Sequence, residues 1–197
     1  KVEQELERQY FSRGKYGVKI TTTVTPLERN RVGISIAVSE GRAARIKKIS
    51  IVGNDVYDDE TLLESFQLST PTLLSFYTGV DQYSKQKLSG DLETLRTYYL
   101  DRGYINFNID STQVSITPDK KDIYITINIT EGEQYKVKEV RLAGDLVVEP
   151  EELFPLVQMN PGDVFSRKRI TETVTQVSEK LGDQGYAFAN VNTIPEI

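Results

Sequence analysis

The sequence predicts an α+β fold built of tandem β-α-α-β-β modules, each a three-stranded mixed sheet with two helices packed on one face. Two motifs indicate the repeat: Ser39-Glu40-Gly41 returns as Thr130-Glu131-Gly132, and Ile51-Val52-Gly53-Asn54 returns as Leu142-Ala143-Gly144-Asp145 at the same spacing. Landmarks that recur at one fixed spacing are typical of repeat proteins. The third observation is the segment Ile123–Ile129, in which every second residue is isoleucine, as expected for a strand with one buried face.

The complete module covers residues 42–133 and begins with a strand. Isoleucines at positions 46, 49 and 51 precede the turn Gly53-Asn54, which predicts a strand over Ile46–Val52. Asp58-Asp59-Glu60 then precede an apolar stretch, which predicts a helix N-terminus with a side-chain cap and charges that favour the helix dipole. A catalytic carboxylate pair is the alternative interpretation of these acids, but no His or metal-ligand cluster accompanies them.

The second helix of the module shows one apolar stripe at helical spacing. The stripe consists of Leu88, Leu92, Leu95 and Tyr99. We expect it to face the sheet, and we expect the solvent side of the helix to carry Asp91, Glu93 and Arg96.

Two further strands are expected over Ile105–Ile116 and Ile123–Ile129, joined by a polar turn at residues 117–122. The second of these strands is expected in the centre of the sheet, with Ile46–Val52 and Ile105–Ile116 on its flanks. Both flanking edges could then accept an additional strand from a partner, the binding mode called β-augmentation. The alternative is that both edges are simply solvated.

The strand Ile105–Ile116 changes its apolar phase halfway. Its first half is apolar at odd positions, up to Ile109, whereas Val114 and Ile116 lie at even positions. Either a β-bulge near Asp110-Ser111-Thr112 restores the phase, or Val114 and Ile116 point outward as a recognition patch. The candidate partner-binding residues are therefore Asp110, Ser111, Thr112, Gln113, Val114 and Ile116.

The flanking segments repeat parts of the same module, which predicts three portions with boundaries at 1–41, 42–133 and 134–197. Residues 1–41 match the second helix and the last two strands. Residues 134–197 match a first strand, a first helix near Glu149–Val157, a second helix and the beginning of a strand. The linkers Gly41–Arg45 and Gly132–Lys136 are short, so neighbouring modules are expected to move within a limited range. The chain reads as a fragment of a longer array.

Composition excludes most other classes of function. The chain contains neither Cys nor His, which removes thiolate chemistry, the commonest general base and the commonest zinc ligand, so we expect neither an enzyme nor a cofactor or metal site. A net charge of -5 with interspersed signs argues against a nucleic-acid partner. The apolar residues of the loop Ser69–Tyr83 are expected to pack across their own module, with exposure as the alternative.

The module order and several motifs resemble POTRA modules, the polypeptide-transport-associated domains. The resemblance is carried by Gly-Asn after the first strand, by Arg-Gly-Tyr before the second, and by three longer segments of the complete module: 90–96, 98–104 and 107–115. In particular, these segments are similar to the POTRA modules of proteins that assemble outer-membrane β-barrels in Gram-negative bacteria. The resemblance covers nearly the whole chain and places its three portions in the second, third and fourth modules.

This resemblance implies a location in the periplasm and a membrane β-barrel beyond the C-terminus of the chain. It also implies lipoproteins of the assembly machinery and unfolded outer-membrane proteins as partners, with a lipoprotein docking on the second strand of the middle module. The alternative reading is a related array that acts mainly as a structural spacer.

Overall fold

The computed structural model describes residues 2–71, 81–144, 146–186, 188–194 and 196. The chain forms two compact units, which are described separately. The first comprises Lys1–Leu95 and Ile109–Thr130, and the second comprises Arg96–Asn108 and Glu131–Ile197. The apolar residues expected to pack in the loop Ser69–Tyr83, at positions 73–80, lie outside the described residues.

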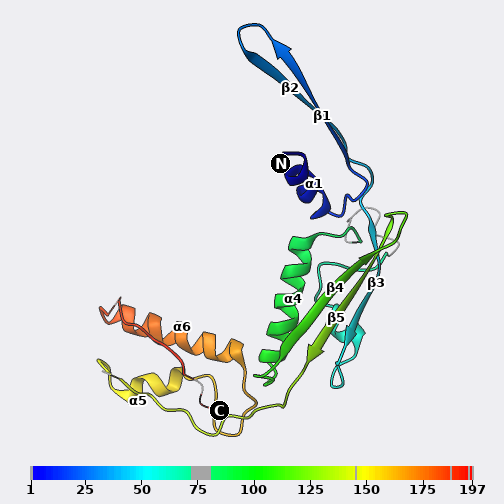
Figure 1. The fold of residues 1–197 in the computed structure, drawn as a ribbon. Coiled ribbons are helices and arrows are strands. Elements are labelled where there is room, and N and C mark those ends of the chain that lie inside the picture. The colour runs from blue at the N-terminus through cyan, green and yellow to red at the C-terminus, as the bar shows by residue number, and fades with distance from the viewer. Residues whose placement is uncertain (1, 72–80, 145, 187, 195, 197) are drawn as a thin grey trace. The chain divides into compact units, whose positions relative to one another are not determined.

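A three-stranded sheet is the centre of the first unit (Figure 1). It contains β3 (Arg45–Val52), β5 (Asp122–Thr130) and β4 (Asn108–Ile116) in the order β3-β5-β4, so β5 is central as predicted. β3 runs parallel to β5, and β4 returns antiparallel through the turn at residues 117–121. A mixed sheet with helices on one face confirms the predicted fold class.

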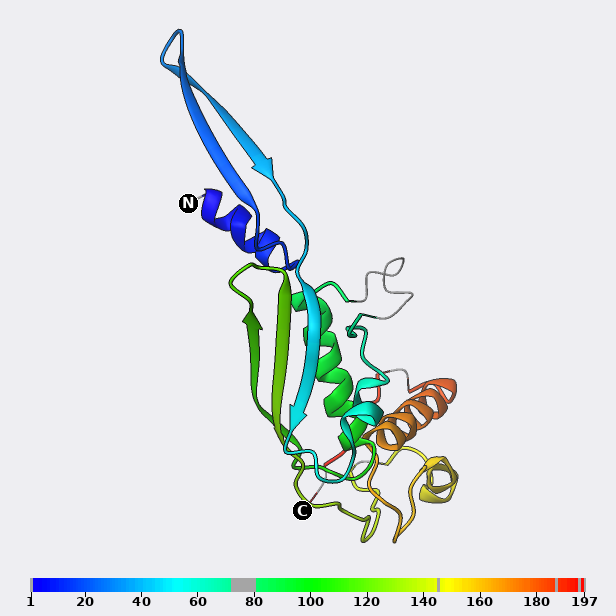
Figure 2. The same cartoon turned by 90° about the vertical axis from the view of Figure 1, so that its right-hand side faces the viewer.

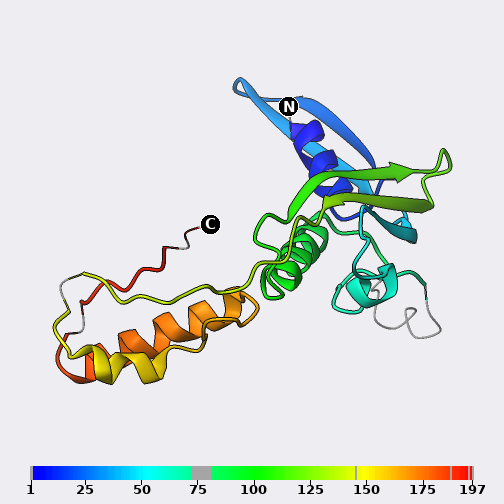
Figure 3. The same cartoon turned by 90° about the horizontal axis from the view of Figure 1, so that it is seen from below.

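The sheet buries one face under α4 (Lys85–Leu100), as the view from below shows (Figure 3). The buried side chains are those of the alternating residues, namely Ile46, Ile49 and Ile51 of β3 and Ile123, Ile125, Ile127 and Ile129 of β5. Leu88 and Leu95 of the predicted helix stripe are buried as well. The short helix α2 (Asp59–Leu63) begins at Asp58, whose side chain accepts a hydrogen bond from the Thr61 N–H and caps the helix as predicted.

Asp91 corrects the prediction that the polar side of α4 faces solvent. Its side chain is completely buried, and its carboxylate accepts the backbone N–H groups of Gln67 at 2.7 Å and Leu68 at 3.0 Å. The chain segment that follows α2 covers this side of the helix, and it needs an acceptor for its N–H groups there. Periodicity alone could not indicate such a contact.

The first unit also contains α1 (Val2–Phe11) and a separate antiparallel hairpin of β1 (Lys19–Leu27) and β2 (Arg31–Ser39), visible in Figure 2. The helix and the hairpin correspond to the predicted second helix and last two strands of a module. One face of the hairpin is apolar, because residues on that face of β1 pair with apolar partners in β2: Ile20 with Val38, and Val24 with Ile34.

The second unit contains the last turn of α4 and α6 (Arg167–Asp183), together with α5 (Pro150–Leu153) and the 3-10 helix η1 (Phe154–Leu156). Leu153 of α5 packs with Val177 and Leu181 of α6 in one buried cluster. A second cluster surrounds Tyr99, whose ring stacks on Phe107 at 4.3 Å between centroids.

Two predicted strand boundaries were wrong. The second strand of the middle module begins at Asn108 rather than Ile105, because residues 104–107 form a turn that places Phe107 on the Tyr99 ring. In the portion 134–197, the expected first strand is reduced to a bridge between Lys136 and Val164, and residues 188–194 form no strand.

Candidate interaction edge of the three-stranded sheet

The sheet has two edges, β3 and β4, and the register of β4 on β5 decides what the β4 edge offers. The Thr117 main-chain N–H donates to the Asp122 carbonyl at 3.0 Å, and the side-chain amide of Asn128 donates to the Ser111 hydroxyl at 2.8 Å. Both contacts fit one antiparallel register. It places Val114 opposite Ile125 and Ile116 opposite Ile123.

A bulge interrupts this register at the start of β4. The Thr130 hydroxyl donates to the Asp110 carboxylate at 2.7 Å, whereas the neighbouring Ser111 contacts Asn128. Asn128 and Thr130 are two apart and lie on the same face of β5, so Asp110 and Ser111, although consecutive, also lie on one face. This is the geometry of a β-bulge, in which two residues oppose one.

The bulge settles where the apolar side chains of β4 point. Val114 and Ile116 share the face of Ile125 and Ile123, the face that α4 covers, rather than the opposite face. Each of them remains 37% exposed because they lie at the rim of the covered area. The alternative of a patch on the outer face is thereby excluded by the register.

The main chain of β4 presents regularly spaced groups to solvent beyond the bulge. In an antiparallel pair, residues alternate between those bonded to the partner and those whose N–H and C=O point away from it. Since Thr117 is bonded to Asp122, the groups that point away from β5 belong to Thr112, Val114 and Ile116. Thus the candidate residues divide into Asp110 and Ser111, which form the bulge, Gln113, which bonds to β5, and the three outward residues.

The β3 edge is more obstructed than the β4 edge. The Ile46 N–H donates to the Asp81 carbonyl at 2.7 Å, and Arg45 forms an antiparallel bridge with Gln82. The register with β5 shifts between Ile46 and Lys48, so Lys47 is a bulge residue. Exposed lysines disfavour strand addition, and the main chain of Asp81 and Gln82 already occupies the start of this edge. β4 is therefore the more accessible edge.

A carboxylate is fixed at the hairpin end of β4. The Thr117 hydroxyl donates to Asp119 at 2.6 Å, and this hydrogen bond holds the pKa of the Asp119 carboxyl below its usual range. The Asp119 carboxylate also pairs with Lys121 at 3.8 Å, so the charges of this turn offset one another.

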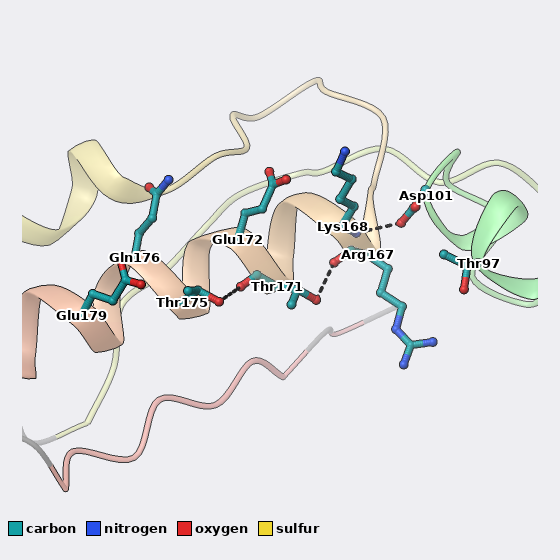
Figure 4. A pocket seen from close by; sticks show the side chains of 9 residues that line it. All are labelled: Thr97, Asp101, Arg167, Lys168, Thr171, Glu172, Thr175, Gln176 and Glu179. Atoms are coloured by element: carbon teal, nitrogen blue, oxygen red, sulfur yellow. Dashed lines mark hydrogen bonds between the residues drawn. The ribbon is translucent and has the colours of Figure 1, made fainter. Parts of the chain in front are cut away.

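The second unit contains a shallow hollow of about 590 Å³ along α6 (Figure 4). Threonine, acidic and basic side chains form its walls: Thr97, Asp101, Arg167, Lys168, Thr171, Glu172, Thr175, Gln176 and Glu179. Throughout the described part of the chain, no three His, Cys, Asp or Glu residues are grouped so that they could hold a metal ion. The described helices include none with the length and apolar character needed to cross a membrane.

Sequence reasoning identified the β4 segment but missed the residues that decide between the edges. Asp81 and Gln82 cover part of β3 through their main chain, and main-chain pairing leaves no side-chain signature in such a short segment. The sequence pattern indicates for Asn128 and Thr130 only that they are polar residues alternating with the isoleucines of β5. Their polar character on its outer face was the available signal for the bulge.

The architecture defines an array of small α/β modules that presents an open sheet edge, and comparison with known proteins identifies the family. The POTRA family model, described as surface antigen variable number repeat, matches residues 44–132 and 135–197. The chain belongs to the POTRA family.

Individual relatives support the same conclusion. The chain is 33% identical over 191 residues to outer membrane protein assembly factor BamA of Neisseria meningitidis, covering 96% of this chain and 24% of the relative. The BamA protein of Buchnera aphidicola is also 33% identical, with 86% and 28% covered. The chain thus spans about a quarter of the length of these curated relatives.

A solved structure of POTRA modules 3–5 of Haemophilus influenzae BamA is similar in fold. It matches with a TM-score of 0.66 and 29% identity, covering 78% of this chain and 60% of that structure. The resemblance predicted from the motifs is confirmed by these matches.

Proposed function

We propose that the chain is the periplasmic part of an outer-membrane protein that assembles other outer-membrane proteins, and that it binds polypeptides there. It acts as a scaffold and not as an enzyme, in keeping with its family and with BamA relatives that are named assembly factors. Its partners are lipoproteins of the assembly machinery and unfolded outer-membrane β-barrel proteins. An array that serves mainly as a spacer is the alternative.

The observation that carries this proposal is the outward main chain of Thr112, Val114 and Ile116 on an edge strand. Main-chain hydrogen bonds are common to all β-strands, so an edge of this kind suits partners of different sequence. A strand that pairs with β4 would place alternate side chains beside Val114 and Ile116, on the face covered by α4. Apolar side chains at these alternate positions would bury the exposed parts of both residues.

The proposal is tested by removing one outward N–H with Val114→Pro. Proline is tolerated on an edge strand when its missing N–H faces solvent, so the sheet should fold. Binding of a fluorescent peptide with the sequence of an outer-membrane β-strand should weaken by about tenfold or more, since one hydrogen bond is lost and the ring obstructs the edge. Fluorescence anisotropy measures the affinity, and circular dichroism checks the fold.

Val114→Thr is the matched control, because it keeps the branched shape and the N–H group. It should bind the peptide nearly as tightly as the unchanged protein. Equal affinity of the proline variant and the control would contradict the proposal. If the unchanged protein shows no detectable peptide binding, the alternative function as a structural spacer is favoured.

A further inference from the structure

The same backbone connection occurs at two places where one module meets the next. In the first unit, the Ala44 N–H donates to the Gly14 carbonyl at 2.9 Å, and the Tyr83 N–H donates to the Ala44 carbonyl at 3.4 Å. In the second unit, Gly103, Tyr135 and Phe165 form the same chain of bonds, at 2.9 and 3.0 Å. We call each set a joint.

Each joint places the end of one module against the second helix of the next. Ser12 and Asp101 occupy the same position of the repeat, two residues before the joint glycine. The Ser12 carbonyl accepts the N–H of Lys85, the first residue of α4, at 2.9 Å. The Asp101 carboxylate accepts the N–H of Lys168, the second residue of α6, at 2.7 Å (Figure 4).

The first turn of α6 needs an acceptor from elsewhere. The first N–H groups of a helix lack partners within the helix, and the side chain of Ser166, the N-cap residue, accepts from the Arg169 N–H at 3.4 Å. The first turn contains Arg167, Lys168 and Arg169 and no acidic residue, although the positive end of the helix dipole favours negative charge. Three cations therefore lie where anions are favoured, and among them Arg169 pairs with Asp163 at 3.4 Å.

We propose that Asp101 is a capping residue that acts across the joint, completing the N-terminus of α6 from the preceding module. Its carboxylate supplies both the acceptor for the Lys168 N–H and the negative charge that the first turn lacks. Ser12 performs the hydrogen-bonding part of this role at the other joint, through its carbonyl group. The repeat position that Ser12 and Asp101 share thus connects, at each of these two joints, one module to the second helix of the next.

The test is amide hydrogen exchange in the 197-residue chain, measured by NMR for Asp101→Ala and Asp101→Asn. Loss of the cap should raise the exchange rate of the Lys168 amide about fivefold to tenfold in Asp101→Ala. Asp101→Asn keeps an oxygen acceptor without the charge, so its rate should lie between those of Asp101→Ala and the unchanged protein. Amides in the middle of α6, such as that of Val177, should change little and serve as an internal reference.

Asp183→Ala is the matched control, because Asp183 occupies the corresponding repeat position, two residues before Gly185, at the end of α6 and is exposed. It should leave the Lys168 amide unchanged. The proposal is overturned if Lys168 exchanges at the same rate relative to Val177 in Asp101→Ala and in the unchanged protein. It is equally overturned if Asp183→Ala or Asp101→Asn raises the rate as much as Asp101→Ala does.

Discussion

Two aspartate side chains, one in α4 and one just after it, make contacts with other chain segments that the helical periodicity of the sequence does not predict. Asp91 lies on the polar side of α4 yet is buried against the backbone of Gln67 and Leu68. Asp101, near the end of the same helix, binds a backbone N–H of α6. In both cases a carboxylate satisfies N–H groups of another chain segment, and its place in the amphipathic pattern gives no sign of this.

Asp91 makes the stability of the first unit depend on pH. Burial raises the pKa of its carboxyl above the usual 3.8, against the opposing effect of the two N–H donors. A raised folded-state pKa in an acid contributes stability below the unfolded pKa, and this contribution is lost as pH rises through the folded pKa. Asp91→Asn cannot titrate and retains one acceptor oxygen.

The expected result is that the free energy of unfolding of Asp91→Asn, relative to the unchanged protein, becomes more favourable as pH rises from about 4 to about 7. Urea unfolding at several pH values measures this difference. Asp91→Ala should lose about 1–3 kcal/mol near neutral pH, because both N–H groups lose their acceptor. A relative stability of Asp91→Asn that falls with rising pH would be the opposite of this expectation.

At the scale of the element, the bulge gives β4 its two properties. It returns Val114 and Ile116 to the face covered by α4, and it leaves the segment beyond it regular up to the hairpin turn. The phase change in the sequence predicted that a bulge or an outward patch must exist, and the cross-strand hydrogen bonds of Asp110 and Ser111 decide for the bulge.

The register predicts that aspartates introduced on the two faces of β4 differ in their effect on stability. Val114→Asp together with Ile116→Asp places carboxylates on the covered face, next to Ile125 and Ile123, and should lower the free energy of unfolding by about 1–3 kcal/mol. Gln113→Asp together with Ser115→Asp places the same charges on the outer face and should stay within about 0.5 kcal/mol of the unchanged protein. Urea denaturation compares the two variants, and equal losses would refute the register.

At the scale of the whole molecule, much of the fold could be predicted because the repeat is regular. Equal spacing of the two Glu-Gly motifs and of the two turn glycines indicated the repeat, and strict alternation in Ile123–Ile129 located the central strand. The family followed from the motifs. These features depend on local periodicity, which a single sequence displays directly.

The features that could not be predicted depend on contacts between distant segments. Phe107 leaves the expected strand to stack on Tyr99, and Asp81 and Gln82 cover the edge of β3 through their main chain. The strand expected after Lys136 is reduced to a bridge with Val164. The choice of β4 over β3 as the open edge therefore required the structure.

The central claim is that partners pair with the main chain of β4 beyond the bulge, and amide hydrogen exchange in the presence of a strand peptide tests it most directly. Binding should protect the outward amides of Thr112, Val114 and Ile116, while the Gln113 and Ser115 amides, which already bond to β5, should change little. Protection at Ile49 and Ile51 of β3 instead, whose amides point away from β5, with the three β4 amides unchanged at saturating peptide, would contradict the claim.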